Sequence, residues 1–166
     1  NHGIGRLALV QPDGFDPDRA RWMAPNAHHI IDEALFCSSL SEAIAGSQRV
    51  LGTSARPRQW PWPVLSPPAA ADQIIDDPMS TALVFGPEDS GLSTDDLGLC
   101  HGILNVPTEE GTSINLGQAV SICCAALLTT EHARSNDAVP EADEPVDASF
   151  QEALIHQGIE VLDAAG

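Results

Sequence analysis

Residues 83–128 read LVFGPEDSGLSTDDLGLCHGILNVPTEEGTSINLGQAVSICCAALL, and the pattern of residues within this segment predicts the fold class. One apolar run ends at Phe85 and is stopped by Gly86, and a second ends at Val106 and is stopped by Pro107. Short apolar runs bounded by Gly or Pro are typical of buried strands in a parallel sheet. Ligands of such sheets bind where the strands end and the loops begin. The stretch therefore predicts an α/β fold with two strand-end loops at one edge of a parallel sheet.

A long helix is predicted to begin near Leu116. Apolar residues recur there at the helical spacings i, i+3, i+4, i+7 and i+8 and form one wide face. They are Leu116, Ala119, Val120, Cys123, Cys124, Leu127 and Leu128. Ile122 and Ala125 lie off this face, so we expect the helix to be buried on more than one side. Ser113 or Asn115 could cap its first turn, and exposed N–H groups there would also suit a polar ligand. The spacing alone leaves capping and ligand binding both open.

The loop from Gly86 to Gly91 has the glycine spacing of a phosphate-binding loop but lacks its chemistry. That motif continues with Lys, whereas here Leu92 follows, and Glu88 and Asp89 would repel phosphate. We therefore exclude a nucleoside triphosphate site. The loop suits a ligand that is cationic or neutral at its contact point, or else it is a plain strand-to-helix turn with solvated carboxylates.

Composition limits the function classes. The 166-residue chain has 24 acidic residues, 7 Arg and no Lys, which gives a net charge of −17. RNA binding needs cations to neutralise phosphates, so the balance is unfavourable for it. Six of the Arg residues lie in residues 1–62, however, and any RNA surface should come from there. No apolar run reaches the roughly 20 residues that span a bilayer, and no signal peptide is visible, so we expect a cytoplasmic protein without membrane contact.

The four cysteines and six histidines show no metal-ligand spacing, so we predict no metal site. Cys123 and Cys124 lie on the apolar face of the predicted helix. We interpret all four cysteines as reduced core residues.

The remaining chain is predicted from its patterns of apolar and turn residues. Short runs predict strands at 6–10 and 50–53, and helices at 16–24, 41–45 and 67–75. Trp22 and Met23 are expected to pack inward, and Ile30 and Ile31 to sit in a connector. Residues 56–68, rich in Pro, Arg and Trp, predict a loop or extended arm. Its Arg and Trp side chains could hold phosphate and stack on bases, or the Trp side chains could simply pin the loop.

The last part of the chain changes in composition. Residues 134–147 are acidic, contain two Pro and lack large apolar side chains, which predicts a flexible linker. Residues 148–166 predict a short amphipathic helix, which is too short to be stable alone and must dock on something. We therefore expect one domain over residues 1–133, a linker over 134–147 and a docking or dimer helix over 148–166.

Three segments in order resemble a known family. GPEDSGLS (86–93), NVP (105–107) and TSINLGQAV (112–120) are similar to the second and third motifs of the SpoU/TrmH ribose 2'-O-methyltransferases of the SPOUT superfamily. The resemblance extends upstream through GRLALVQP (5–12) and TSARPR (53–58), and covers roughly residues 1–133. TSARPR and the tail are most similar to the TrmJ branch, which modifies tRNA at the start of the anticodon loop.

The resemblance implies a fold with a C-terminal trefoil knot, a homodimer, and methyl transfer from S-adenosylmethionine to a ribose hydroxyl of RNA, with tRNA favoured over rRNA. Catalytic roles are implied for Glu88, Ser113 and Asn115. Arg56 and Arg58 would contact RNA. The cofactor pocket would be lined by Thr53, Ser54, Ala55, Gly86, Val106, Ser113, Ile114 and Asn115.

The first motif of this family, an Asn and an Arg on a helix before the first strand, is not in the sequence. Residues 1–3, Asn-His-Gly, are similar to its end. We expect the sequence to begin within the domain, in which case the chain as given lacks residues used in catalysis. The alternative is a SPOUT-like protein that binds a cofactor or RNA without turnover.

Overall fold

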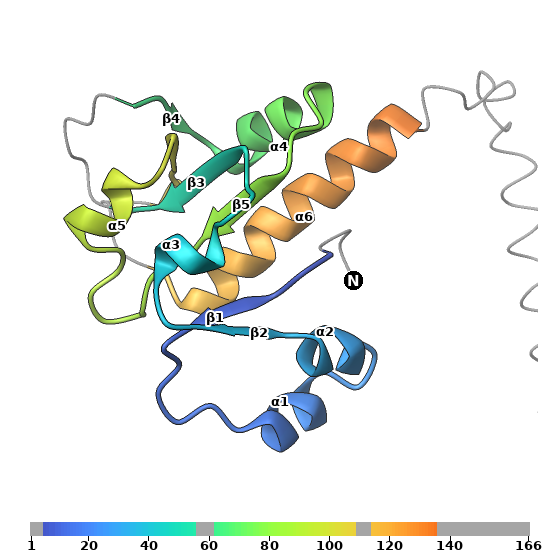
Figure 1. Cartoon of the computed structure of the whole chain (residues 1–166). Helices are drawn as coiled ribbons and strands as arrows, with labels where there is room; N and C mark the ends of the chain where they lie inside the picture. Colours follow the sequence, from blue (N-terminus) through green and yellow to red (C-terminus); the bar gives the residue numbers. More distant parts are fainter. Residues whose placement is uncertain (1–4, 56–61, 109–113, 136–166) are drawn as a thin grey trace, which may run out of the picture. The chain divides into compact units, whose positions relative to one another are not determined.

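The computed structural model describes residues 5–55, 62–108 and 114–135. The chain divides between Ala133 and Arg134 into two units, and nearly all of the described residues belong to the first. Helices and strands are interspersed along them (Figure 1). In chain order they are β1 (Ala8–Val10), α1 (Pro17–Met23), α2 (His28–Asp32), β2 (Leu35–Cys37), α3 (Leu40–Ala43), β3 (Arg49–Thr53), β4 (Val64–Leu65), α4 (Pro67–Asp76), β5 (Thr81–Val84), α5 (Thr94–Gly98), β6 (Gly102–Leu104) and α6 (Leu116–Ser135).

The described strands pair only in parallel and form two sheets. The larger has the order β4-β6-β3-β5, so β3 lies between β6 and β5. In its register Leu51 pairs with Leu83 of β5 and with Gly102 of β6. β1 and β2 form a separate two-stranded sheet. Because paired parallel strands run the same way, the carboxyl ends of β3, β5 and β6 share one edge. The predicted parallel α/β fold is confirmed, with its strands in two sheets.

β3 lies at the centre of the core. Leu51 packs in one cluster with Ala70 of α4 and Cys123 of α6. Val50, the preceding residue, packs in a second cluster that Leu40 of α3 joins. Successive side chains of a strand point to opposite faces, so α4 and α6 cover one face of the larger sheet and α3 the other (Figure 1). Burying an aliphatic side chain of this size stabilises the fold by about 1.5–3 kcal/mol.

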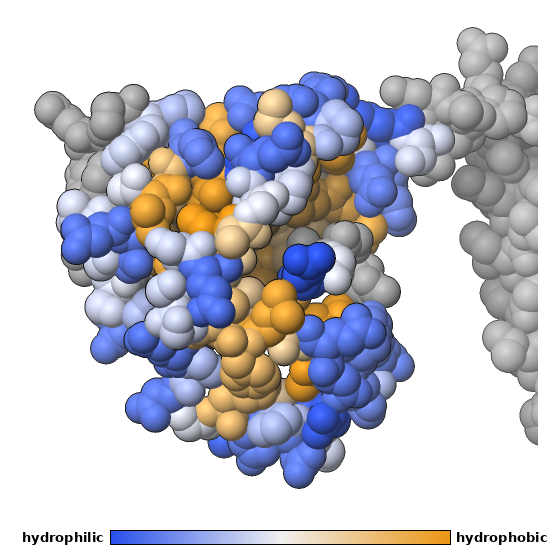
Figure 2. All heavy atoms as spheres, viewed as in Figure 1, coloured by the Kyte–Doolittle hydropathy of each residue, from blue (hydrophilic) through white to orange (hydrophobic). Residues whose placement is uncertain are grey.

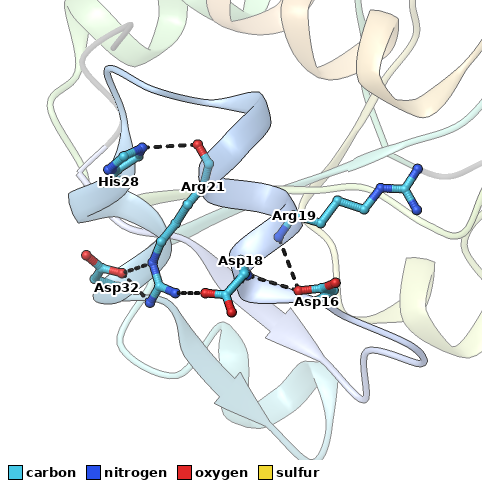
Figure 3. A network of polar contacts seen from close by, with 6 residues as sticks. All are labelled: Asp16, Asp18, Arg19, Arg21, His28 and Asp32. Carbon is cyan, nitrogen blue, oxygen red and sulfur yellow. Dashed lines mark hydrogen bonds and ion pairs between the residues drawn. The ribbon is translucent and has the colours of Figure 1, made fainter.

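α1 and α2 are joined by a polar network centred on Arg21 (Figure 3). Its guanidinium donates to Asp32 Oδ1 at 2.7 Å and to Asp18 Oδ1 at 2.8 Å. The ring nitrogen Nε2 of His28 lies 3.0 Å from the Arg21 carbonyl oxygen. Arg21 thus ties its own helix to the next one.

Two expectations about buried side chains are wrong. Trp22 and Met23 are 83% and 71% exposed, because α1 buries none of its residues and is held by the polar contacts of Arg21. α6 is buried on one side only, at Cys123 and Cys124, while Ile122 is 42% exposed. Ile30 and Ile31 also lie in a helix, α2, rather than in a connector.

Further apolar side chains reach the surface on the smaller sheet. Val10, Leu35 and Phe36 are all exposed, and Figure 2 shows apolar surface over the β1–β2 region. Phe36 meets Phe15 edge to face, with ring centroids 5.6 Å apart.

All four cysteines are buried and unpaired, as expected for reduced core residues. Within the described ranges, no helix combines the length and apolarity needed to cross a membrane. The same residues contain no group of three or more His, Cys, Asp or Glu side chains placed to hold a metal ion.

Candidate functional site

The carboxyl ends of β3, β5 and β6 and the first turn of α6 surround a pocket of about 300 Å³. Each of the three strands continues into a loop at this edge, and each loop forms one wall. The lining residues are Thr53–Ala55 at the end of β3 and just after it, Phe85–Leu92 after β5, Leu104, Val106 and Thr108 around the end of β6, and Ile114, Leu116 and Ala119 at the start of α6.

Most of the residues predicted for the site meet at this pocket. Those that line it are Thr53, Ser54, Ala55, Gly86, Glu88, Val106 and Ile114. Asn115 is joined to the pocket wall through Glu88. Three predicted residues, Ser113, Arg56 and Arg58, lie outside the described residues.

The wall after β5 is a loop that folds back tightly on itself. A Cβ atom on Gly86 would lie 2.3 Å from the backbone carbon of Gly91 and from the backbone nitrogen of Leu92. The Gly91 N–H donates to the Pro87 carbonyl at 2.8 Å, and Gly91 has φ 69°. Only glycine adopts this φ without strain, and only glycine at position 86 lets the two backbones approach so closely.

Glu88 and Asn115 join the β5 loop to α6. The Asn115 side-chain nitrogen donates to Glu88 Oε1 at 2.6 Å. The Asn115 side-chain oxygen accepts from the backbone N–H of Gly117 at 2.9 Å and of Gln118 at 3.4 Å. One side chain therefore caps the helix and holds a carboxylate at the pocket wall. The capping role that the sequence left open for Asn115 is present in the structure.

Two further side chains cross-link the strand ends. The Thr53 hydroxyl donates to the Val84 carbonyl at 3.0 Å, which ties β3 to β5. The Asn105 side-chain nitrogen donates to the Ser54 carbonyl at 2.8 Å, which ties the end of β6 to the loop after β3. Asn105 is not among the residues that the sequence predicts for the site. The available signal was its position, a polar residue directly after a buried strand and two residues before Pro107.

The lining has a distinct electrostatic character. Its charged side chains among the described residues are Glu88 and Asp89, and none is Arg or Lys. Leu104, Val106 and Ile114 add apolar surface. Such a pocket favours a ligand with an apolar body and a positive charge over a phosphate-bearing one.

A larger hollow, of about 600 Å³, lies elsewhere in the first unit. It is lined by residues from the start of β1 and β2 and from α2, among them Arg6, His29 and Glu33. It contains no residue predicted for the site, and it is not at the carboxyl ends of the strands, where ligands of parallel sheets bind. The smaller pocket is therefore the candidate site.

Comparison with known proteins identifies the family of the chain. A family model described as the SpoU rRNA Methylase family matches residues 1–125. The tRNA (cytidine/uridine/adenosine-2'-O-)-methyltransferase TrmJ of Pseudomonas aeruginosa is 39% identical over 126 residues, which are 74% of this chain and 49% of that protein. The chain thus spans about half the length of this relative.

Solved structures agree in fold. TrmJ from Z. mobilis superposes with a TM-score of 0.72 at 30% identity, covering 99% of this chain and 70% of that one. A probable methylase family protein from Haemophilus influenzae gives a TM-score of 0.76 at 28% identity, covering 96% of this chain and 67% of that one. The chain therefore belongs to the SpoU rRNA methylase family, and its resemblance within that family is to TrmJ.

Proposed function

We propose that this chain carries the cofactor-binding domain of an RNA ribose 2'-O-methyltransferase that uses S-adenosylmethionine, with tRNA as substrate. Membership of the SpoU family and the names of the TrmJ relatives support the reaction and the substrate. Because the chain spans about half of such a relative, the proposal concerns the activity of the whole protein to which this domain contributes.

One observation carries the proposal, namely the pocket that three strand ends and α6 enclose. S-adenosylmethionine bears a sulfonium charge, an adenosine and an amino-acid tail, and has no phosphate. The lining fits these features, because its described charged side chains are both acidic and its apolar residues suit an adenine ring. When bound, the cofactor supplies an electrophilic methyl group for in-line displacement by a ribose oxygen.

The residues of the chain would orient the reactants. Thr53, Ser54, Gly86, Val106 and Ile114 would hold the cofactor. Ala55 would line the same wall. Glu88, held by Asn115 at 2.6 Å, would keep a carboxylate at the pocket wall and orient groups around the reacting atoms. Fixing such a group in advance lowers the cost of aligning donor and acceptor.

The finer parts of the proposal come from the family resemblance. The chain after Pro107 would thread the trefoil knot, and two copies would form a homodimer in the cytoplasm. Ser113 would act beside Asn115, and Arg56 and Arg58 would contact the anticodon loop. Residues 134–147 would link the domain of residues 1–133 to a docking helix over 148–166.

Isothermal titration of the 166-residue chain with S-adenosylmethionine tests the cofactor assignment. We expect saturable binding at one site per chain. A flat titration with folded protein would falsify the assignment. Transfer of a labelled methyl group by the whole protein to tRNA, compared with an rRNA fragment, then tests the substrate. Binding without transfer would instead favour a cofactor-binding protein without turnover.

Asn115 gives a sharper test, because its two roles can be separated. Asn115→Ser retains a capping oxygen but is too short to hold Glu88, whereas Asn115→Ala loses both contacts. Both variants should lose methyl transfer by the whole protein, and only Asn115→Ala should also lose the cap, which is worth about 1 kcal/mol. Full activity in Asn115→Ser would remove the Glu88 contact from the proposal.

A further inference from the structure

Asn105 is a half-buried residue directly after β6 that makes contacts to two neighbouring chain segments. Its backbone N–H donates to the Leu65 carbonyl of β4 at 2.8 Å. Its side-chain nitrogen donates in the other direction, to the Ser54 carbonyl at 2.8 Å. The residue therefore connects β4, on one side of β6, to the loop that leaves β3 on the other.

This connection lies where the backbone ladder between β3 and β6 ends. The last backbone bond in it runs from the Ser54 N–H to the Leu104 carbonyl at 3.1 Å. Asn105 adds one more bond, made by a side chain, to the carbonyl of the same Ser54. Ser54 and Ala55 both line the pocket, whereas Asn105 does not. Asn105 therefore acts on a ligand indirectly, through the chain segments that line the pocket.

We propose that Asn105 is a positioning residue that fixes the Ser54–Ala55 wall of the pocket and so sets its affinity for adenosyl ligands. The inference rests on the proposed function. Thr53 makes the corresponding bond on the other side of β3, to the Val84 carbonyl. Together the two side chains fix the relative positions of the three strand ends that enclose the pocket.

The expected effect is on binding rather than on the chemical step, because Asn105 lies behind the wall. Loss of one hydrogen bond of this kind weakens a dependent equilibrium by about fivefold. Removing the Asn105 donor should therefore raise the dissociation constant for S-adenosylhomocysteine by about that factor. The maximal rate of the whole protein at saturating cofactor should change much less.

The structure offers a matched control at the other end of β3. The backbone N–H of Val50 donates to Nδ1 of His101 at 2.9 Å, in a partly buried bond of almost the same length. His101 does not line the pocket. Asn105→Leu replaces a side chain that bonds to the loop after β3, and His101→Leu replaces one that bonds to β3 itself. Both introduce an apolar side chain, and only the first acts at the pocket.

The experiment measures S-adenosylhomocysteine binding by titration and amide hydrogen exchange of the peptide that contains Ser54 and Ala55. Asn105→Leu should bind about fivefold more weakly and exchange faster there, while His101→Leu should match the wild-type chain in both. Asn105→Asp, which keeps the shape but replaces the donor by an acceptor, should behave like Asn105→Leu, and it serves if the Leu variant does not fold.

The outcomes distinguish a failure of the role of Asn105 from a failure of the proposed function. Wild-type affinity in Asn105→Asp, or equal weakening in His101→Leu, overturns the role of Asn105. No binding by the wild-type chain overturns the proposed function. If the wild-type chain does not bind, the hydrogen-exchange measurement still tests whether Asn105 holds the Ser54–Ala55 wall, because exchange needs no ligand. Unchanged exchange in both Asn105 variants would show that Asn105 does not hold this wall.

Discussion

Gly86 is the residue at which the candidate site has the least room. A Cβ atom there would overlap backbone atoms of Gly91 and Leu92 at 2.3 Å. Backbone cannot move aside as a flexible side chain can, so Gly86→Ala should push the loop open. Overpacking of this kind costs about 1–3 kcal/mol, and we expect binding of S-adenosylmethionine to weaken by about tenfold or more in a titration.

Gly98 provides the control for this substitution. It lies in α5, and a Cβ atom there would meet nothing within 4 Å. Gly98→Ala should leave binding unchanged and, if anything, stabilise the helix, because Ala has the higher helix propensity. Wild-type affinity in Gly86→Ala would mean that the loop does not shape the site.

The buried thiols predict how stability responds to alkali. Burial, and then the neighbouring Cys124, raise the pKa of Cys123 from 9.0 to about 11. Burial and then Asp96 raise the pKa of Cys100. A raised pKa means that, as the pH rises, the unfolded chain loses its thiol proton before the folded chain does. The contribution of the protonated thiol to the free energy of unfolding is therefore complete below about pH 9 and is lost as the pH rises towards 11. Melting temperatures measured over this range should fall.

The reactivity of the thiols provides a control measurement of their burial. The native chain should react slowly with a disulfide reagent near neutral pH, since the thiolate is the reactive form and burial disfavours it. Denaturant should expose all four thiols to rapid reaction. Cys123→Ala should flatten part of the alkaline fall in melting temperature. Fast native labelling of Cys123 would contradict its burial.

Single residues also show what the sequence could and could not predict about the site. Thr53, Gly86 and Glu88 were predicted from motif resemblance, and the structure brings them to one pocket. The bond from Asn105 to Ser54 could not be predicted. It joins residues 51 positions apart, and its existence depends on the register between β3 and β6, which local patterns do not contain.

At the scale of secondary structure, the link between α1 and α2 depends on Arg21. Its guanidinium bonds to Asp18 and Asp32, while the Arg19 guanidinium makes no bond within the described residues and points away from the network (Figure 3). Arg21→Met should lower the melting temperature by no more than a few degrees, because exposed ion pairs contribute little. The loss should shrink as salt is added.

Arg19→Met is the matched control on the same helix. It removes the same charge without breaking an ion pair of the network, so its melting temperature should stay close to that of the wild-type chain. A fall equal to that of Arg21→Met would show that net charge, and not the link between the helices, explains the effect.

Elements were predictable where they were long or deeply buried. β3, β5, α4 and α6 follow patterns of several apolar residues with clear stop signals. β2, β4 and α2 were missed, because none of them combines an apolar run of four or more residues with a Gly or Pro that stops it. β4 also lies in a Pro-rich segment, and only its pairing with β6 makes it a strand.

For the molecule as a whole, convergence of the strand-end loops was predictable from topology, since parallel strands share one carboxyl edge. The division of the strands into two sheets was not, because the pattern of apolar runs says nothing about which runs pair. The exposed Trp22 shows the same limit, since an apolar side chain packs inward only where another element covers it.

The net charge of −17 makes a prediction for the whole chain. Excess negative charge repels itself in the compact state, and the repulsion is felt over a Debye length of about 30 Å at 0.01 M salt but only about 8 Å at 0.15 M. The melting temperature should therefore rise with sodium chloride. Neutralising two exposed acids, Asp13→Asn with Glu33→Gln, should raise it at low salt, and the difference should vanish at high salt. A neutral osmolyte at equal osmolarity should not erase that difference. A salt-independent melting temperature would mean that the acids are spaced too widely to repel one another.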